Sequence, residues 1–245
     1  MLISERQSKI AELIQKEGSV QVETLAEKLG VSAMTIRRDL EKLDYAGIVE
    51  RCYGGAVAKK EVIYAEKQVH NKREKEVLAK RALQFIEDRS VIFLDAGTTI
   101  YEIARLVMGM KDLLVVTNDL EIAQLLKNGE PEVMLCGGYI QKSTGSMLGN
   151  YAMNMIADFR FDIGFFGAAT IDEKMQVLTP TIDKAFFKKQ TVSQCQESYL
   201  VVDESKFDKK AMIRINQLSD YTGVITNHDL KEAGRANIIY VPIKE

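Results

Sequence analysis

The sequence lacks the features that mark membrane, metal-binding and disulfide-linked proteins. No stretch approaches the roughly 18 consecutive apolar residues of a membrane-spanning helix, and the N-terminus lacks the basic and apolar segments of a secretory signal. Three cysteines and two histidines offer neither the even count of a disulfide framework nor the spacing of a metal site. They are Cys52, Cys136, Cys195, His70 and His228. We therefore expect a cytoplasmic protein with reduced thiols, no metal site and no cofactor.

The charge of the chain is close to balanced. Of its 245 residues, 46% are hydrophobic and 28% are charged, and the formal net charge is −2. This composition is typical of a soluble globular protein, and the length allows two domains. Any basic surface that contacts a polyanion must therefore be local.

Residues 20–45 carry the spacing of two helices joined by a short turn. The apolar positions 22, 25, 26 and 29 repeat at helical spacing. Gly30 suits the left-handed end of the first helix, and Ser32 is a favourable N-cap for the second. This spacing predicts a helix-turn-helix, braced by an earlier helix over residues 4–16.

The second helix of the pair has the side chains of a recognition helix. Ile36, Leu40 and Leu43 form its buried stripe. We therefore expect Met34, Thr35, Arg37 and Arg38 to point outward from its N-terminal half. That half of a recognition helix enters the major groove, where arginine pairs with guanine. Residues 48–56 predict a β-hairpin wing beside it. The alternative is a small helical bundle with solvated arginines. The predicted DNA contacts are Ser32, Met34, Thr35, Arg37, Arg38, Arg51 and Tyr53.

From residue 72 onward, short apolar runs alternate with amphipathic helices. This alternation predicts an α/β domain with a mostly parallel sheet covered by helices on both faces. The predicted strands are 91–94, 113–117, 132–136, 163–167, 199–202, 223–226 and 238–241. The predicted helices are 72–86, 100–108, 120–127, 153–158 and 183–194.

Polar residues and glycines follow several of these strands, at the edge where open α/β sheets bind ligands. Gly97 permits close approach of a ligand to the backbone, and the N-terminus of the next helix favours an anion. Lysines near the strand ends could pair with a phosphate, and aspartates could accept sugar hydroxyls. The alternative is a set of ordinary helix caps and solvated lysines. The predicted ligand contacts are Asp95, Gly97, Thr98, Thr99, Asn118, Gly137, Gly138, Gly167, Asp183, Lys188, Asp203 and Lys206.

Two sets of residues resemble the DeoR family of bacterial transcription regulators. The run Thr-Ile-Arg-Arg-Asp-Leu at 35–40, followed by Gly-Gly-Ala at 54–56, resembles the winged-helix head of that family. The segments 95–99, 117–118, 137–138 and 203–207 resemble its sensor domain. The resemblance implies a sensor similar in fold to ribose-5-phosphate isomerase that binds a phosphorylated sugar or polyol. It divides the chain into a DNA-binding domain at 3–58, a linker at 59–71 and a sensor at 72–245.

The resulting hypothesis is a homodimeric or homotetrameric repressor of a carbohydrate uptake or catabolism operon. It would bind duplex operator DNA and be released by a small phosphorylated effector, with no catalytic residues and no membrane contact. One alternative is a sugar-phosphate isomerase with an added DNA-binding head, which would need a base and an electrophile from Asp95, Asp183 and Lys206. Another is an activator or a nucleoid-type DNA-binding protein with a vestigial sensor.

Overall fold

The computed structural model describes residues 3–17, 19–45, 49–52, 54–58, 68–209, 211, 213–230 and 234–243. The described residues up to 58 form one compact unit, and those from 68 onward, apart from position 211, form a second. Positions 59–67 of the predicted linker lie outside the described residues.

The first unit is a winged helix-turn-helix, as predicted. Its three short strands pair antiparallel in the order β1-β3-β2, and its core collects buried residues from all three helices. Gly30 adopts a left-handed conformation with φ 65° and ends the second helix, so the chain can turn into the third. The sequence did not predict β1. The elements are α1 (Ile3–Glu17), β1 (Ser19–Gln21), α2 (Val22–Leu29), α3 (Ala33–Tyr45), β2 (Val49–Cys52) and β3 (Gly55–Ala58).

A buried ion pair fixes α1 against α3. Asp39 of α3 is only 2% exposed, and its carboxylate accepts a hydrogen bond from Arg6 Nε at 2.6 Å. Gln7 Nε2 donates to the other oxygen at 3.0 Å. A buried carboxylate needs such partners, because an isolated charge is costly to remove from water. Asp39 therefore helps to hold the angle at which α3 is presented.

The second unit is built on a seven-stranded sheet with strand order β15-β14-β12-β9-β4-β5-β6. Every neighbouring pair in this sheet is parallel, which confirms the predicted sheet type. The strands are β4 (Val91–Leu94), β5 (Leu114–Thr117), β6 (Glu132–Leu135), β9 (Phe161–Phe166), β12 (Cys195–Val202), β14 (Gly223–Thr226) and β15 (Ile238–Tyr240).

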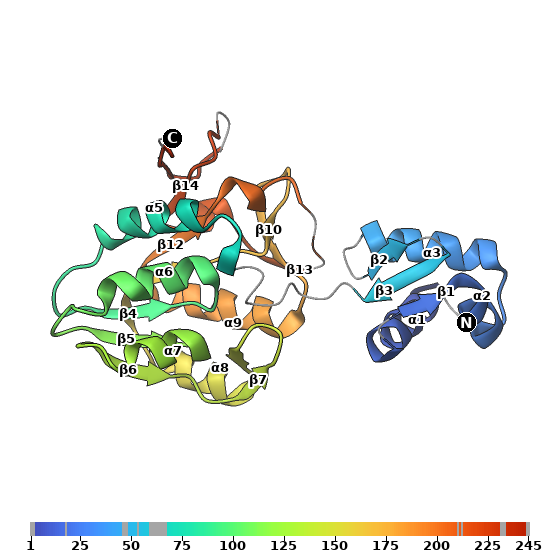
Figure 1. Cartoon of the computed structure of the whole chain (residues 1–245), viewed down its shortest axis with the longest axis horizontal. Coiled ribbons are helices and arrows are strands. Elements are labelled where there is room, and N and C mark those ends of the chain that lie inside the picture. The colour runs from blue at the N-terminus through green and yellow to red at the C-terminus, as the bar shows by residue number, and fades with distance from the viewer. Residues whose placement is uncertain are drawn as a thin grey trace. The chain divides into compact units, whose positions relative to one another are not determined.

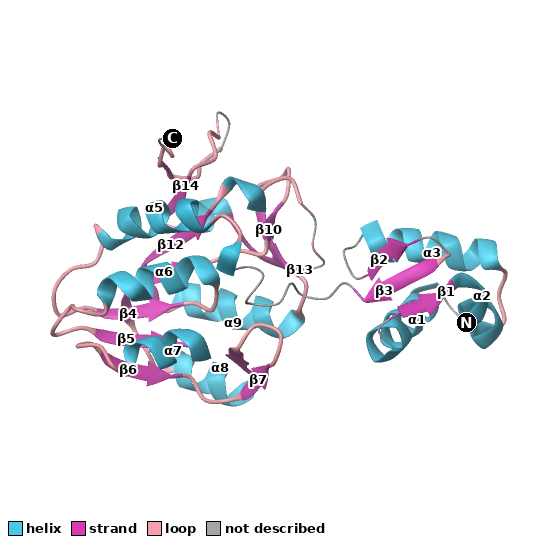
Figure 2. Cartoon of the chain, in the orientation of Figure 1, coloured by secondary structure: helices cyan, strands magenta, loops and turns pink. Residues whose placement is uncertain are grey.

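Helices cover both faces of this sheet, as Figures 1 and 2 show. Ile92 and Leu94 of β4 pack with the helices of one face, whereas Phe93 between them belongs to the core on the other face. Successive strand residues point to opposite faces, so continuous apolar runs are needed where both faces are buried. The first face carries α5 (Lys72–Leu83), α6 (Thr98–Val107) and α7 (Leu120–Leu126). The second carries α8 (Asn150–Ala157) and α9 (Ile182–Ser193).

Two small sheets, which the sequence did not predict, flank the main one. Their strands have only two to five residues, and several are half exposed, so they lack the long apolar runs of the parallel strands. Strands β7 (Tyr139–Gln141) and β8 (Ser146–Leu148) form a hairpin. The other sheet contains β10 (Thr170–Ile171), β11 (Gln176–Thr179) and β13 (Ile213–Gln217). Short 3-10 helices are η1 (Glu204–Lys206) and η2 (Leu218–Asp220).

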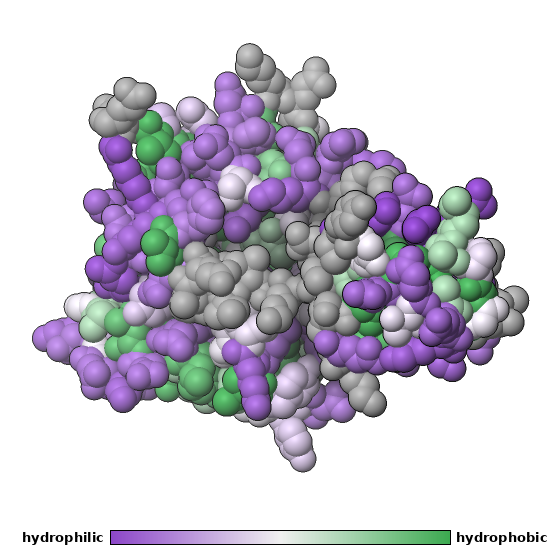
Figure 3. All heavy atoms as spheres, turned by 45° about the vertical axis from the view of Figure 1, so that its right-hand side comes forward, coloured by the Kyte–Doolittle hydropathy of each residue, from purple (hydrophilic) through white to green (hydrophobic). Residues whose placement is uncertain are grey.

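The surface is predominantly hydrophilic on the face drawn in Figure 3, where hydrophobic residues gather in separate patches. Among the described helices, none combines the length and the apolar character that crossing a bilayer requires. Cys136 and Cys195 are free thiols, and burial raises the pKa of each to about 12. A thiol with such a pKa stays protonated and unreactive near neutral pH.

Candidate functional site

The start of α3 has the geometry of a recognition helix. Ser32 Oγ accepts a hydrogen bond from the Thr35 backbone nitrogen at 3.2 Å and lies 2.9 Å from Thr35 Oγ1. Ser32 therefore caps α3, as its position predicts. Met34 is 59% exposed, and Arg37 and Arg38 are also exposed. The predicted outward side chains thus leave the helix on its solvent side, while Ile36 and Leu40 enter the core.

Arg37 and Arg51 have only loose acidic partners among the described residues. Arg37 lies 3.8 Å from Glu23, and Arg51 of β2 lies 3.9 Å from Glu41, with both pairs exposed. Exposed ion pairs of this kind contribute about 0–1 kcal/mol, so a phosphate could displace the carboxylates at little cost. Arg37 and Arg51 also line one shared hollow, which includes Gly54. The helix and the wing therefore turn cations toward the same surface. Tyr53 lies outside the described residues.

A second site lies where the connections of the parallel sheet diverge. Strand β4 continues through α6 to β5 on one side, whereas β9, on the other side of β4, continues toward β12. In open α/β sheets, ligands bind in a crevice beyond the carboxyl ends of the strands at such a divergence, so this end of the sheet is the candidate crevice. Asp95 follows β4 and Gly167 follows β9.

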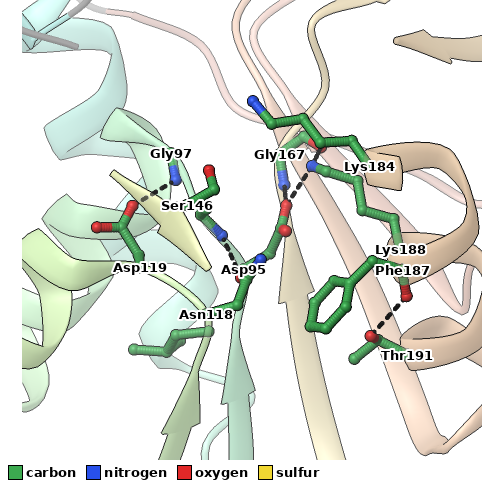
Figure 4. Close-up of polar contacts among 12 residues, drawn as sticks. Asp95, Gly97, Asn118, Asp119, Ser146, Gly167, Lys184, Phe187, Lys188 and Thr191 are labelled. Atoms are coloured by element: carbon green, nitrogen blue, oxygen red, sulfur yellow. Dashed lines mark hydrogen bonds and ion pairs between the residues drawn. The ribbon is translucent and has the colours of Figure 1, made fainter. Parts of the chain in front are cut away.

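Asp95 lies directly after β4, at the candidate crevice, and has no solvent exposure. Its Oδ2 accepts a hydrogen bond from Gly167 N at 3.0 Å and forms an ion pair with Lys188 Nζ (Figure 4). Lys188, from α9, also donates to the Gly167 carbonyl at 2.7 Å. Asp95 Oδ1 is buried and has no hydrogen-bond partner among the described residues. A buried carboxylate oxygen without a donor is costly, so this atom can accept a hydrogen bond from a ligand.

The end of β5 holds the loop that follows β4. Asn118 Oδ1 accepts from Ala96 N, and Asp119 Oδ2 accepts from Gly97 N, each at 3.0 Å. Gly97 has φ 156° and ψ 155°, a conformation that residues with a side chain rarely adopt. It precedes Thr98, the first residue of α6, whose first-turn N–H groups lack carbonyls four residues earlier in the helix. The loop therefore directs a helix N-terminus toward the crevice.

Asp119 was not predicted as a site residue. Its Oδ1 caps α7 by accepting from Glu121 N at 2.8 Å and Ile122 N at 3.2 Å. Burial raises the pKa of Asp119 to about 6, and the hydrogen bonds from Ile122, Glu121 and Gly97 oppose that rise. Since three backbone donors already occupy its carboxylate, Asp119 shapes the crevice rather than offering a free base.

The β7–β8 hairpin forms a further wall, which the sequence also missed. Thr144 and Ser146 place their hydroxyl oxygens 2.9 Å apart, and Lys184 Nζ of α9 donates to Thr144 Oγ1 at 3.2 Å. Lys184 and Lys188 are one helical turn apart and both are buried. In the sequence, only this four-residue spacing could have indicated that Lys184 lies beside Lys188 at the site. A lysine on an amphipathic helix is normally solvated, so the spacing did not predict burial.

The predicted ligand contacts divide into separate groups. Asp95, Gly97, Asn118, Gly167 and Lys188 are linked by the contacts above. Thr98 and Thr99 are buried in the first turn of α6. Asp183 stands apart from them: it is exposed on α9 and accepts a hydrogen bond from Tyr139 OH.

The paired glycines after β6 have a local structural role. Gly137 and Gly138 are exposed and lead into β7. A Cβ on Gly138 would lie 2.2 Å from the Leu148 carbonyl oxygen, and its φ is 141°. Gly138 thus permits the close approach of the two hairpin strands.

Asp203 and Lys206 belong to a further cluster at the end of β12. Asp203 is 1% exposed, and its Oδ1 accepts from Ser205 N at 3.0 Å and from Asn71 Nδ2 at 2.8 Å. Its Oδ2 is buried without a partner in the described part of the chain. Burial raises the pKa of Asp203, but Ser205, Lys206 and Asn71 outweigh that effect and hold the pKa below its usual value. Lys75 carries a further positive charge near Lys206.

The winged helix-turn-helix and its exposed arginines define a DNA-binding protein, and the parallel sheet of the second unit has the divergence of connections at which open α/β sheets bind ligands. Comparison with known families agrees with both assignments. Residues 6–62 match the DeoR-like helix-turn-helix domain, and residues 70–228 match the DeoR C terminal sensor domain. The chain therefore belongs to the DeoR family of transcriptional regulators.

Individual relatives match over almost the whole chain. The HTH-type transcriptional regulator GlpR of Haloferax volcanii is 34% identical over 242 residues, covering 97% of this chain and 95% of the relative. The lactose phosphotransferase system repressor of Staphylococcus aureus is 31% identical over 247 residues, covering 98% of each. Among solved structures, a D-ribose-5-phosphate isomerase in complex with phospho-erythronic acid has a TM-score of 0.41 and 20% identity, covering 55% of this chain and 53% of that one.

Proposed function

We propose that this protein represses a carbohydrate uptake or catabolism operon and leaves its operator when a phosphorylated sugar or polyol binds to the sensor unit. The observation that carries the ligand site is the buried, unpartnered Oδ1 of Asp95, beside the N-terminus of α6. A hydroxyl group would satisfy Asp95, and a phosphate would suit the helix terminus. Sugar phosphates and polyol phosphates carry both groups. The name of the Staphylococcus aureus relative refers to a sugar transport system, which supports the carbohydrate assignment.

In this proposal, two groups of residues divide the recognition of the effector. Thr98, Thr99 and Lys206 contact the phosphate, whereas Asp95 and Asn118 contact hydroxyls. Lys188 pairs with Asp95 Oδ2, whereas Oδ1 has no partner among the described residues and is left for the ligand. Gly97 and Gly167 leave space for the ligand in this proposal: apart from chain neighbours, a Cβ built on Gly97 would meet nothing within 4 Å, and one built on Gly167 would first meet Ile100 at 3.9 Å.

The operator contacts in this proposal lie on α3 and the wing. Arg37 and Arg38 reach base edges or phosphates in the major groove, with Met34 and Thr35 beside them, while Arg51 contacts the backbone. Since one winged helix reads only a short half-site, we propose a homo-oligomer that places two heads about 34 Å apart or a multiple of that spacing. A hundredfold release by the effector requires a coupling of roughly 2.7 kcal/mol, which is an ordinary magnitude for allostery.

Catalysis of sugar-phosphate isomerisation is not part of this proposal. Isomerisation requires a free base with a pKa near about 6–7 beside an electrophile. Asp119 has a pKa of about 6, but backbone N–H groups of Gly97, Glu121 and Ile122 occupy its oxygens. Turnover of ribose 5-phosphate by the purified protein would overturn this part of the proposal.

Two measurements on the full chain test the proposed function. A thermal-shift screen against sugar and polyol phosphates should reveal a ligand that adds about 2.7 kcal/mol of stability at 100 times its Kd. Gel retardation with fragments of the source genome should reveal a salt-sensitive, site-selective complex that the same ligand dissociates. A site-selective complex that no phosphorylated metabolite weakens would refute effector release and favour an activator or a constitutive binder.

A further inference from the structure

The residue before α5, Asn71, has an unusual backbone conformation, and its side chain forms a hydrogen bond to the end of β12. Asn71 precedes α5 with φ 51° and ψ 42°, a left-handed conformation that few non-glycine residues adopt. Its side chain does not cap the helix that it precedes. Instead, Asn71 Nδ2 donates at 2.8 Å to Asp203 Oδ1, which is 132 positions later in the chain. The contact therefore joins the beginning of the sensor to the carboxyl end of β12.

A second contact holds the residue before Asn71. Lys75 Nζ donates to the His70 carbonyl oxygen at 2.6 Å, although the lysine is only 3% exposed. Lys75 also lies within the electrostatic range of Lys206, Asp203 and Glu102. The main chain at position 70 and the side chain at position 71 are thus both tied to one group of charged residues.

This charged group shares one residue, Lys206, with the proposed effector site. Lys206 is a proposed phosphate contact and also acts electrostatically on Asp203. Glu102 belongs to α6, one turn after the threonines that begin that helix. An anion bound to Lys206 weakens the electrostatic attraction between that lysine and the Asp203 carboxylate. Asp203 then depends more strongly on Asn71 and Lys75, which hold residues 70 and 71.

We propose that the hydrogen bond from Asn71 to Asp203 transmits occupancy of the effector crevice to the segment that leads, along the chain, to the DNA-binding unit. This inference rests on the proposed function, and it assigns Asn71 as a positioning residue rather than a ligand contact. The bond joins the carboxyl end of β12 to the residue before α5. Loss of the bond uncouples the two activities without abolishing either.

Two substitutions test this role. Asn71→Gly removes the side-chain amide but keeps a residue that accepts positive φ. Asn71→Asp keeps the size and the tolerance of positive φ, but places a carboxylate against Asp203. The matched control is Asp112→Gly. Asp112 is exposed, has φ 57° and precedes β5, so it lies at the amino-terminal ends of the strands, away from the crevice at their carboxyl ends.

The experiment measures the operator Kd of the full chain with and without three probes: ribose 5-phosphate, fructose 6-phosphate and glycerol 3-phosphate. The probe Kd is measured with and without operator, because true coupling must appear equally in both directions. For a probe that weakens operator binding by the wild type, we expect the coupling factor to fall at least tenfold in both Asn71 variants and to be retained in Asp112→Gly. Each variant should still bind operator alone and probe alone, with affinities within a few-fold of wild type.

The possible failures are distinguishable. If no probe alters operator binding by the wild type, the proposed sugar-phosphate or polyol-phosphate effector fails and this inference fails with it. If the wild type responds and both Asn71 variants respond to the same extent, only the role of Asn71 is overturned. An equal loss of coupling in Asp112→Gly would also overturn it, because the effect would then follow any change at a left-handed position.

Discussion

Removal of the Asp95 carboxylate should destabilise the sensor unit strongly, because it leaves a buried cation without its partner. The side chain of Lys188 is 11% exposed and that of Asp95 has no exposure. Breaking such a pair from one side costs about 3–5 kcal/mol, and the backbone N–H of Gly167 also loses its acceptor. For a unit of this size, each 1 kcal/mol lowers the Tm by roughly 2–4 °C, so Asp95→Ala should lower it by roughly 6–20 °C.

Calorimetry of four proteins separates this effect from simple loss of packing. Asp95→Ala and Lys188→Met each leave one buried charge unpaired, whereas the double variant leaves none. We expect the double variant to be less destabilised than the sum of the two single variants by at least about 2 kcal/mol. If the two single effects add within about 0.5 kcal/mol, the ion pair is not a stabilising unit and the reasoning is refuted.

Three further predictions concern other elements. Arg37→Ala or Arg38→Ala should weaken operator binding by about 1–3 kcal/mol and relax one base preference, measured by gel retardation on single-base operator variants; uniform weakening would indicate a phosphate contact. Since burial raises the pKa of Asp119 from 3.8 to about 6, the unfolded chain ionises first and stability falls as pH rises through this range, by at most roughly 3 kcal/mol. Asp119→Asn should remove that dependence from calorimetric Tm values between pH 4 and 7; an unchanged slope would assign it to other groups. Gly138→Ala should destabilise the sensor by about 1–3 kcal/mol in urea, because its Cβ would lie 2.2 Å from Leu148 O; unchanged stability would show that the hairpin relaxes without cost.

The sequence predicted the elements whose hydrophobic pattern is continuous. β4 and β5 are short runs of apolar residues, and helices α6 and α7 bury one periodic stripe, so pattern alone locates them. The helix-turn-helix was predictable for the same reason, since Gly30 and Ser32 mark its turn. By contrast, the strands of the β7–β8 hairpin have three residues each and no clear alternation.

Residues whose function depends on distant partners were harder to predict. Asp39 gives no sign of burial in the sequence, because its partner Arg6 lies 33 positions earlier. Lys184 is buried only because the hairpin hydroxyl of Thr144 approaches α9 from 40 positions earlier. Residues at the carboxyl ends of parallel strands were easier to predict, because all these ends lie on the same side of the sheet. Asp95 and Gly167 could therefore be grouped before their contact was visible.

The crossover between β6 and β9 supplies one wall of the proposed effector site without contributing a strand to the parallel sheet. Between these strands the chain passes to the other side of β4, and on the way it builds the β7–β8 hairpin that walls the crevice. The hydrogen bonds of the parallel sheet join β4, β5, β6 and β9 to one another, whereas β7 pairs with β8 in a separate sheet. Loops on a rigid scaffold tolerate insertion and replacement. Changes confined to the β7–β8 hairpin could therefore alter which metabolite a related protein binds, while the strands of the parallel sheet stay unchanged.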